Sequence, residues 1–242
     1  MKKRMLLISN STMAGEPYLY YTKPFIKEFF KEINFTPDNK NIIFIPYAAV
    51  TFSFDKYVNN VNKALSELNI KVKGIQNYNN PKKAIEDADM IIVGGGNTWQ
   101  LIKMLQDNKL LEPIKKKVEE GIPYIGWSAG SNVACPTIKT TNDMPIVEPK
   151  NFNAIGLINF QINPHYLDAN PKNFGGETRE QRIKEFLEAN KNTTVVGLRE
   201  GTMLYVSGNK EIILWGNKNA RIFKHGNEPK EIVPNQNLLI FL

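Results

Sequence analysis

The sequence predicts an α/β fold, in which a mostly parallel sheet carries helices on both faces. Apolar runs of strand length recur over about the first 200 residues: 5–8, 42–46, 72–75, 90–93, 124–127, 157–162 and 194–198. Between these runs, other segments carry apolar residues at helical spacing: 25–33, 57–68, 99–105 and 182–187. Regular alternation of strands and helices is typical of parallel sheets, because each parallel connection needs a crossover.

The pattern changes after about residue 200, where short strands flank two turn-forming segments. These turns are Ser207-Gly208-Asn209-Lys210 and His225-Gly226-Asn227, and they predict a small antiparallel C-terminal extension. With 242 residues and 42% hydrophobic composition, the chain can bury a sizeable core. We find no internal repeat and no long linker, so we expect a single domain over residues 1–242.

The sequence carries no convincing signal peptide or membrane-spanning segment. The N-terminal Met1-Lys2-Lys3-Arg4-Met5 imitates the basic start of a signal peptide, but the apolar run behind it stops at Ile8, which is too short for a signal sequence. No stretch approaches the apolar length of a membrane span, and the lone cysteine, Cys135, excludes an intramolecular disulfide. The sequence therefore predicts a cytoplasmic protein that does not act at a membrane.

The net charge of +7, from 31 basic and 24 acidic residues, is scattered along the chain. The densest basic runs, 2–4 and 115–117, are short and lack the interleaved aromatic residues of single-strand binders. We therefore expect no nucleic-acid partner, and interpret these runs as solvated surface. Two distant histidines and one cysteine do not supply the usual zinc ligands, so no metal or other cofactor is expected.

The segment Gly126-Trp127-Ser128-Ala129-Gly130 directly follows an apolar run and has the form of a nucleophile elbow. A strand that turns sharply into a helix can lift one serine out of the sheet edge, and flanking glycines allow the tight backbone. The expected helix, 131–134, would point its free N–H groups at the serine. The alternative is an ordinary strand-to-helix turn with the same letters.

A serine hydroxyl needs a base to become nucleophilic, and imidazole is the usual one. The chain has two histidines. His165 comes just after the predicted strand 157–162, whereas His225 lies in a predicted surface turn. His165 is therefore the better candidate.

Four features follow predicted strands and should meet at one edge of the sheet, where α/β proteins bind ligands: the run 94–97, Ser128, His165 and Glu200. A glycine run, a serine, a histidine and a carboxylate at one edge favour a catalytic site. Ordinary turns without a common function would not be expected to bring these four features to the same edge.

The run Gly94-Gly95-Gly96-Asn97 lacks the spacing of a dinucleotide site. The N–H of Gly95 or Gly96, together with that of Ala129, would instead hold the negative oxygen of a tetrahedral intermediate. Asn97 is a candidate substrate-binding residue. The alternative is a tight strand-to-helix turn that Asn97 caps.

Five segments, taken together, closely resemble the peptidase E family, serine peptidase family S51: 94–98, 126–132, 140–146, 162–165 and 176–182. The resemblance runs from residue 6 to residue 201 and is loose beyond it. It implies a class I glutamine amidotransferase-like, flavodoxin-like fold and a cytoplasmic aspartyl dipeptidase without a cofactor. It leaves open whether the protein is a monomer or a homodimer.

The resemblance implies that Ser128 is the nucleophile and His165 the general base. Two carboxylates, Asp143 and Glu200, match the family pattern for the acid that orients the imidazole. We favour Glu200, because it lies at a strand end and fits the Ser-His-Glu arrangement attributed to the family. Asp143 is kept as a second site carboxylate, with a turn or cap residue as the alternative.

The family cleaves dipeptides with an N-terminal aspartate, so a cation should bind the aspartate side chain. Arg179 is our candidate, because the capping box 178–181 places it in the first turn of a helix, where the dipole disfavours a cation. A guanidinium grips a carboxylate with two parallel hydrogen bonds. The alternative is a surface arginine paired with Glu177 or Glu180, a role that we expect Arg182 to fill.

The segment 166–175 is rich in helix-breaking residues and has no periodicity. It is either a lid that excludes water or a plain surface loop.

Two other functions remain open from the sequence. One is hydrolysis of a different aspartyl linkage, as in the related cyanophycinases. The other is non-catalytic binding of a small molecule on the same sheet. A dipeptide substrate is the interpretation that we favour.

Overall fold

The computed structural model describes residues 3–170, 172–173, 175–208 and 210–242. Three expected features include residues outside these ranges: the basic N-terminal start (Met1 and Lys2), the loop 166–175 (Pro171 and Phe174) and the turn 207–210 (Asn209).

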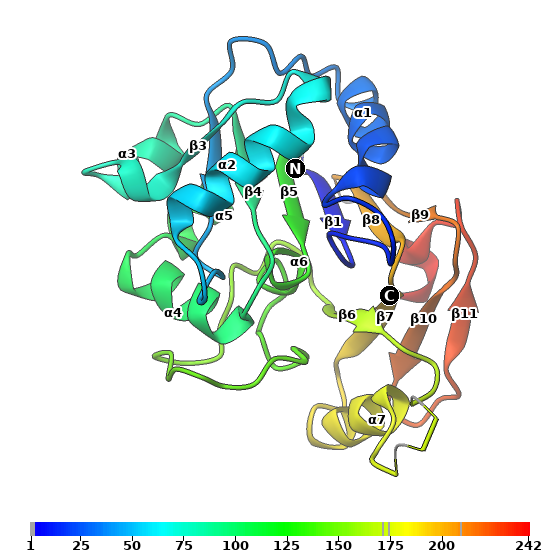
Figure 1. Cartoon of the computed structure of the whole chain (residues 1–242). Helices are drawn as coiled ribbons and strands as arrows, with labels where there is room; N and C mark the ends of the chain where they lie inside the picture. The colour runs from blue at the N-terminus through cyan, green and yellow to red at the C-terminus, as the bar shows by residue number, and fades with distance from the viewer. Residues whose placement is uncertain (1–2, 171, 174, 209) are drawn as a thin grey trace.

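The strands form two sheets, with the orders β3-β2-β4-β5-β1-β8-β9 and β11-β10-β7-β6 (Figure 1). The larger sheet contains β1 (Arg4–Ile8), β2 (Ile42–Ile45), β3 (Val72–Gly74), β4 (Met90–Val93), β5 (Tyr124–Trp127), β8 (Thr202–Ser207) and β9 (Glu211–Gly216). The smaller sheet contains β6 (Gln161–Tyr166), β7 (Thr194–Arg199), β10 (Ala220–Lys224) and β11 (Lys230–Ile232).

The α-helices are α1 (Lys23–Glu32), α2 (Phe54–Leu65), α3 (Pro81–Glu86), α4 (Thr98–Asp107), α5 (Leu111–Glu120), α6 (Ala129–Asn132) and α7 (Arg179–Ala189). Short 3-10 helices cover Tyr20–Thr22, Ser66–Leu68, Ile75–Asn77 and Leu238–Phe241. Within the described part of the chain, every helix is too short or too polar to cross a membrane.

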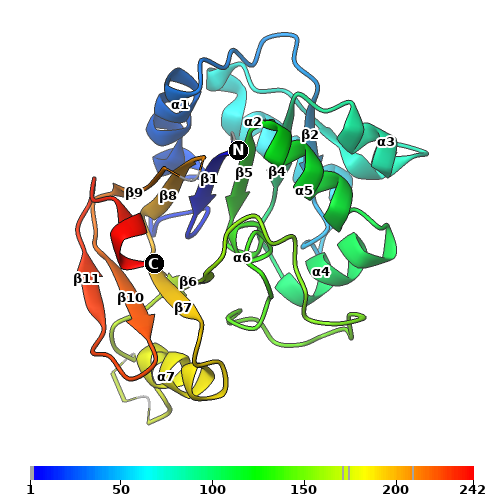
Figure 2. The ribbon, with the colours of Figure 1, turned by 180° about the vertical axis from the view of Figure 1, so that it is seen from behind.

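Helices cover both faces of the larger sheet (Figures 1 and 2). Successive strand residues point to opposite faces, so each face has its own apolar core. Leu6 and Ile8 of β1 pack in the cluster that includes α1 and α2, whereas Met5 and Leu7 pack in the cluster that includes α3, α4 and α5. The predicted α/β fold with helices on both faces is confirmed.

The first five strands of the larger sheet, β1 to β5, pair in parallel, as expected for strands joined by helices. The two strands that follow residue 200, β8 and β9, add to this sheet in antiparallel fashion beside β1. The last two, β10 and β11, are antiparallel in the smaller sheet. The C-terminal strands are therefore antiparallel, as predicted, but they are divided between the sheets.

The predicted strand 157–162 is wrong in its limits, because β6 begins at Gln161 and extends to Tyr166. Leu157 and Phe160 are buried in the main core without forming a strand, so their apolar character reflects loop packing. β6 and β7 pair in parallel, but in the smaller sheet. Pro164 is accommodated because β6 is an edge strand.

Candidate active site

Ser128 occupies a sharp turn between β5 and α6. Its backbone has φ 52° and ψ −113°, outside the regions that non-glycine residues favour. Steric crowding explains why glycine flanks the serine at positions 126 and 130. A Cβ atom on Gly126 would lie 2.4 Å from the carbonyl oxygen of Gly130, and a Cβ on Gly130 would lie 2.2 Å from that of Val93. Side chains at these two positions would force the elbow open, so the Gly-x-Ser-x-Gly pattern follows from close backbone packing.

The imidazole of His165 connects Ser128 with Glu200. His165 Nε2 lies 2.9 Å from Ser128 Oγ, and His165 Nδ1 lies 2.7 Å from Glu200 Oε1. The His165 and Glu200 side chains are 40% and 41% exposed, so the pair is accessible from solvent. If Nδ1 donates its proton to Glu200, Nε2 is free to accept the proton of the serine hydroxyl. That arrangement can generate a serine nucleophile.

The sequence analysis expected His165 to follow a strand. In the structure it lies within β6. Its φ is 53°, and the β6–β7 register shifts between Pro164 and Tyr166. This local bulge turns the imidazole toward the larger sheet. Glu200 follows β7 directly, at a turn completed by Gly201 with φ 86°. The histidine and the carboxylate therefore come from the smaller sheet, and the serine comes from the larger one.

Asp143 forms neither a hydrogen bond nor an ion pair with His165. Its Oδ2 accepts hydrogen bonds from the Thr98 N–H (2.7 Å) and the Thr141 hydroxyl (3.2 Å), and its carbonyl accepts one from Trp99 Nε1 (3.0 Å). A carboxylate at this position caps the N-terminus of α4 and interacts favourably with the helix dipole. The structure thus places Glu200, and not Asp143, beside the imidazole.

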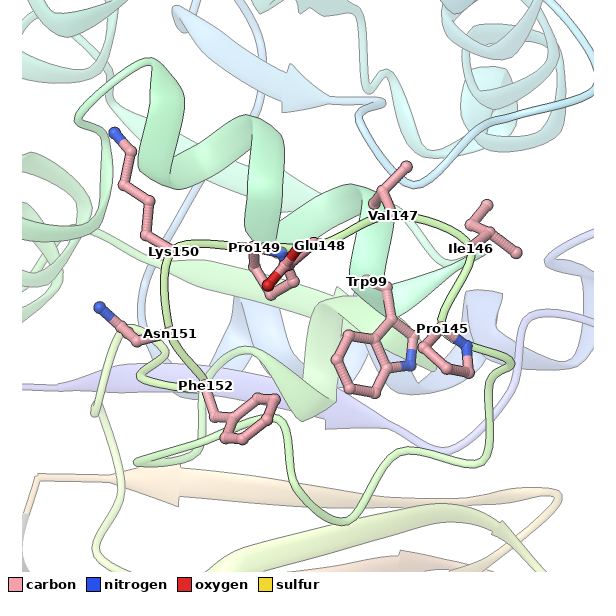
Figure 3. Close-up of a pocket in the computed structure, with 9 residues that line it drawn as sticks. All are labelled: Trp99, Pro145, Ile146, Val147, Glu148, Pro149, Lys150, Asn151 and Phe152. Carbon is pink, nitrogen blue, oxygen red and sulfur yellow. The ribbon is translucent and has the colours of Figure 1, made fainter.

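A cavity of about 690 Å³ opens onto Ser128 and His165. The residues that line it are Ser11, Tyr18, Phe52, Tyr57, Asn60, Gly95, Gly96, Ser128, Asp143 and His165. Three of these residues are aromatic, and Asp143 adds a carboxylate. A separate hollow of about 590 Å³ lies between Trp99 and the loop 145–152 (Figure 3). It contains none of the predicted site residues.

The glycine run 94–97 lies beside the serine. A Cβ on Gly95 would be 3.0 Å from the Cβ of Ser128, and a Cβ on Gly96, whose φ is 132°, would be 2.3 Å from the Ala48 carbonyl oxygen. Among the described residues, the N–H groups of Gly95, Gly96 and Ala129 have no hydrogen-bond acceptor. They are therefore available to a ligand, which the predicted oxyanion role requires.

Tyr57 is a site residue that the sequence analysis missed. Its spacing from neighbouring apolar residues is that of any buried residue of an amphipathic helix. Its hydroxyl donates to the Gly95 carbonyl (2.9 Å) and accepts from Trp127 Nε1 (3.1 Å) and the Tyr18 hydroxyl (3.3 Å). Burial raises the pKa of the Tyr57 hydroxyl, so it stays protonated. It thus fixes the peptide between Gly95 and Gly96.

The side chain of Asn97 already makes two hydrogen bonds within the protein. Its Oδ1 accepts from the Gln100 N–H (3.0 Å), and its Nδ2 donates to the Met144 carbonyl (2.9 Å). It is the N-cap of α4, which was the alternative to a binding role. The structure thus shows the capping role of Asn97, and a role in substrate binding stays a prediction.

Arg179 is the first residue of α7, and the predicted capping box between Thr178 and Gln181 is present. Within the described part of the chain, the guanidinium has neither an ion pair nor a hydrogen bond. The expected surface pair is formed instead by Arg182 with Glu177, at 3.7 Å. Burial lowers the pKa of Arg179, the charge of Arg182 adds to this effect, and only Asp143 opposes it. A half-buried cation of this kind is poised to receive an anion.

No group of three or more His, Cys, Asp or Glu side chains in the described ranges is arranged to hold a metal ion. The side chains that line the cavity include those of Ser128, His165 and Asp143, and Glu200 is joined to the cavity through its hydrogen bond with His165.

An α/β fold with a serine at a strand-to-helix elbow and a histidine beside it defines a class of hydrolases. Comparison with known proteins gives the particular family. The model of peptidase family S51 matches residues 5–214, and the chain belongs to this family. It is therefore a hydrolase, a serine peptidase of the dipeptidase type.

Similar proteins include peptidase E of Nostoc sp., which is 49% identical over 238 residues, covering 98% of this chain and 96% of the relative. Peptidase E of Shewanella amazonensis is 47% identical over 224 residues, covering 93% and 92%. A putative peptidase E protein from Listeria monocytogenes EGD-e has a similar structure, with a TM-score of 0.65, 24% identity and coverage of 89% of this chain and 99% of that one. A peptidase from an acI-B1 Actinobacterium has a TM-score of 0.67, with 18% identity and coverage of 98% and 96%. The last two likenesses concern the fold.

Proposed function

We propose that this protein hydrolyses dipeptides with an N-terminal aspartate, through Ser128, His165 and Glu200. The observation that carries the proposal is the continuous hydrogen-bonded line from Ser128 Oγ through the imidazole to Glu200 Oε1, with distances of 2.9 and 2.7 Å. Nucleophile, base and orienting acid in one line are the requirement for serine-based acyl transfer.

In the proposed mechanism, His165 takes the hydroxyl proton while Ser128 Oγ attacks the carbonyl carbon of the aspartyl residue. Backbone N–H groups of Gly96 and Ala129 stabilise the oxyanion. His165 then donates the proton to the leaving amine, which departs as the second amino acid. Water, activated by His165, hydrolyses the aspartyl ester and restores the serine. Glu200 keeps the imidazole in the required tautomer and stabilises its protonated form.

Substrate recognition is proposed to depend on two charged groups of opposite sign. The unpaired guanidinium of Arg179 is suited to bind the side-chain carboxylate of the substrate aspartate. Asp143 lines the cavity, and its Oδ1 has no hydrogen-bond partner among the described residues. This oxygen is suited to accept from the α-ammonium group of the dipeptide. The two charges together match the N-terminal aspartate.

Hydrolysis of Asp-p-nitroanilide and Asn-p-nitroanilide by the wild-type protein tests the proposal. We expect turnover of the first substrate and a strong preference for it over the second. A parallel comparison of α-Asp-Leu with a β-Asp-Arg substrate checks the linkage. Preferential cleavage of β-Asp-Arg would contradict the dipeptidase assignment and favour a cyanophycinase-like activity, and no turnover of either would indicate a binding protein.

Replacement of Arg179 by methionine is expected to lower the ratio of kcat/KM for Asp- over Asn-p-nitroanilide by about 10- to 100-fold. Hydrogen bonds to a charged group contribute about 1.5–3 kcal/mol, and each 1.4 kcal/mol corresponds to a factor of about ten. Arg182→Met is the matched control, because Arg182 pairs with Glu177 at the surface. An unchanged ratio in Arg179→Met would refute the specificity argument.

Replacement of Tyr57 by phenylalanine is expected to lower kcat about tenfold with little change in KM. The C=O of Gly95 and the N–H of Gly96 belong to one planar trans peptide and point in opposite directions, so the Tyr57 hydroxyl also fixes that N–H. An oxyanion-hole donor acts in the transition state, which is why kcat is the affected constant. Tyr18→Phe, which removes a hydroxyl one step further away, should change kcat less. Equal losses in both variants would argue against this role.

Three other expectations remain predictions. These are the cytoplasmic location, a monomeric or homodimeric state and the organisation as a single domain.

A further inference from the structure

Ser9 follows β1 directly, and its buried hydroxyl connects both sheets. Its Oγ donates to the Leu198 carbonyl of β7 at 2.7 Å and accepts from the His165 N–H of β6 at 3.0 Å. Because β1 belongs to the larger sheet, this single hydroxyl ties two strands of the smaller sheet to the larger one. It does so at the residue that carries the proposed base.

The contact with Ser9 matters because His165 has an uncommon backbone conformation. Its φ of 53° places it in the left-handed region, within a strand whose register shifts at this residue. Such a conformation persists only where the surroundings hold it. The N–H of His165 would be without a partner among the described residues if the Ser9 hydroxyl were removed. Ser9 therefore stabilises the bulge that directs the imidazole toward the nucleophile.

Asn10 stabilises the turn that carries the carboxylate of Glu200, as Ser9 stabilises the bulge that carries the imidazole. It is 1% exposed, and its Oδ1 accepts from the N–H of Gly201 at 2.9 Å; the Tyr21 hydroxyl lies 2.6 Å from both this oxygen and the Asn10 carbonyl oxygen. Its Nδ2 donates to the Thr12 carbonyl at 2.9 Å, which fixes the orientation of the amide. Gly201 directly follows Glu200 in the turn after β7. The buried amide thus fixes the turn from which the carboxylate of Glu200 reaches the imidazole.

The residue before Ser9 completes the pattern. The carbonyl of Ile8 accepts from the Ser128 N–H at 3.0 Å. Three consecutive residues, 8–10, therefore bind the backbone at the serine, at the histidine and next to the glutamate. The first of these contacts uses the main chain and is insensitive to side-chain identity. The other two depend on the serine hydroxyl and the asparagine amide.

We propose that Ser9 and Asn10 are positioning residues that align His165 and Glu200 with Ser128. This inference rests on the proposed function. Neither side chain needs to touch the substrate. Their effect comes from holding two segments of the smaller sheet in register with the elbow of the larger sheet. A displacement of about 1 Å in such a relay can lower the rate by about 10²-fold.

Ser9→Ala and Asn10→Ala test the proposal in the full-length protein with Asp-p-nitroanilide. We expect kcat to fall about 10- to 100-fold in each variant, with KM within about twofold of wild type, because Arg179 and the cavity are untouched. Ser9→Cys keeps a weaker donor and acceptor and should give an intermediate kcat. Thr22→Val is the matched control, because the buried Thr22 hydroxyl donates to the Leu19 carbonyl and neither residue lines the cavity. It should lose some stability and no activity.

The proton between His165 Nδ1 and Glu200 gives a second readout that needs no substrate. The chain has two histidines, so His225→Gln assigns the imidazole signals in NMR spectra of protein labelled with ¹⁵N at histidine. We expect a low-field Nδ1–H resonance of His165 in the wild type and in Thr22→Val, and its weakening in Ser9→Ala and Asn10→Ala. A folded Ser9→Ala protein with unchanged resonance and unchanged kcat would overturn the inference, as would an equal loss of kcat in Thr22→Val. If the wild type fails to cleave Asp-p-nitroanilide, the proposed function fails, and the resonance alone still decides the positioning role.

Discussion

Replacement of Ser128 by alanine is expected to lower kcat for Asp-p-nitroanilide by at least about 10³-fold, since removal of the nucleophile from a serine relay leaves only the contributions of binding and the oxyanion hole. The folded protein should persist, because the Oγ atom has no partner other than His165 Nε2 among the described residues. Steady-state kinetics and thermal unfolding of the same preparation check the two expectations.

Binding should survive this substitution. Isothermal titration of Ser128→Ala with α-Asp-Leu is expected to show an affinity similar to the KM of the wild type, provided that acylation limits the wild-type rate. Asn80→Ala is a suitable control, because Asn80 caps α3, a helix that carries none of the residues that line the cavity. Appreciable turnover by Ser128→Ala would show that another group performs the attack.

Replacement of Glu200 by glutamine should lower kcat by about 10³- to 10⁴-fold, the size of effect seen when a triad acid becomes an amide. The neutral amide no longer stabilises the protonated imidazole. It can also donate to Nδ1, which would place the imidazole proton on Nε2 and block acceptance of the serine proton. Steady-state kcat across the pH range measures the effect, and unfolding curves verify that the fold is kept.

Asp143→Asn provides the contrast to Glu200→Gln. The Thr98 N–H can still be capped by an asparagine oxygen, so the helix should lose little stability. The main expected change is a higher KM, because the negative charge facing the substrate ammonium is lost. A larger fall of kcat in Asp143→Asn than in Glu200→Gln would mean that the roles of the two carboxylates are the reverse of those proposed.

The sequence predicted the α/β class because strand-length apolar runs and helical periodicities alternate clearly in its first half. It failed at residues 157–162, where buried apolar side chains line a loop and hydrogen-bonded pairing begins only at Gln161. Local hydrophobicity reports burial and does not report which backbone groups pair. For the same reason, the separation of β6 and β7 into a second sheet was not visible, since it depends on pairing with β10, more than 20 residues further along the chain.

Two site residues could be predicted because each is marked by its residue type and its immediate sequence neighbours. Ser128 had the glycine-flanked elbow, and His165 was one of only two histidines. The choice between the two carboxylates was made on the position of Glu200 at a strand end, and the structure places that residue beside the imidazole. Asp143 caps the N-terminus of α4, which is 45 residues away in the sequence. No pattern near Asp143 in the sequence indicates this contact.

Residues that act through others were hidden from the sequence analysis. Ser9 follows the first apolar run and belongs to none of the motifs, and its hydroxyl acts on a strand 156 residues away. Tyr57 has the spacing of any core residue of an amphipathic helix. Both become recognisable only when hydrogen-bond partners distant in sequence are known.

In the proposed mechanism, His165, held by Glu200, activates the hydroxyl of Ser128. The rate at which diisopropyl fluorophosphate modifies Ser128 tests it most directly, with the modified peptide located by tandem mass spectrometry in the wild type, His165→Gln and Glu200→Gln. We expect modification of Ser128 in the wild type and rates that fall steeply in both variants, in step with kcat. Modification at another residue, or equal rates in all three proteins, would contradict it.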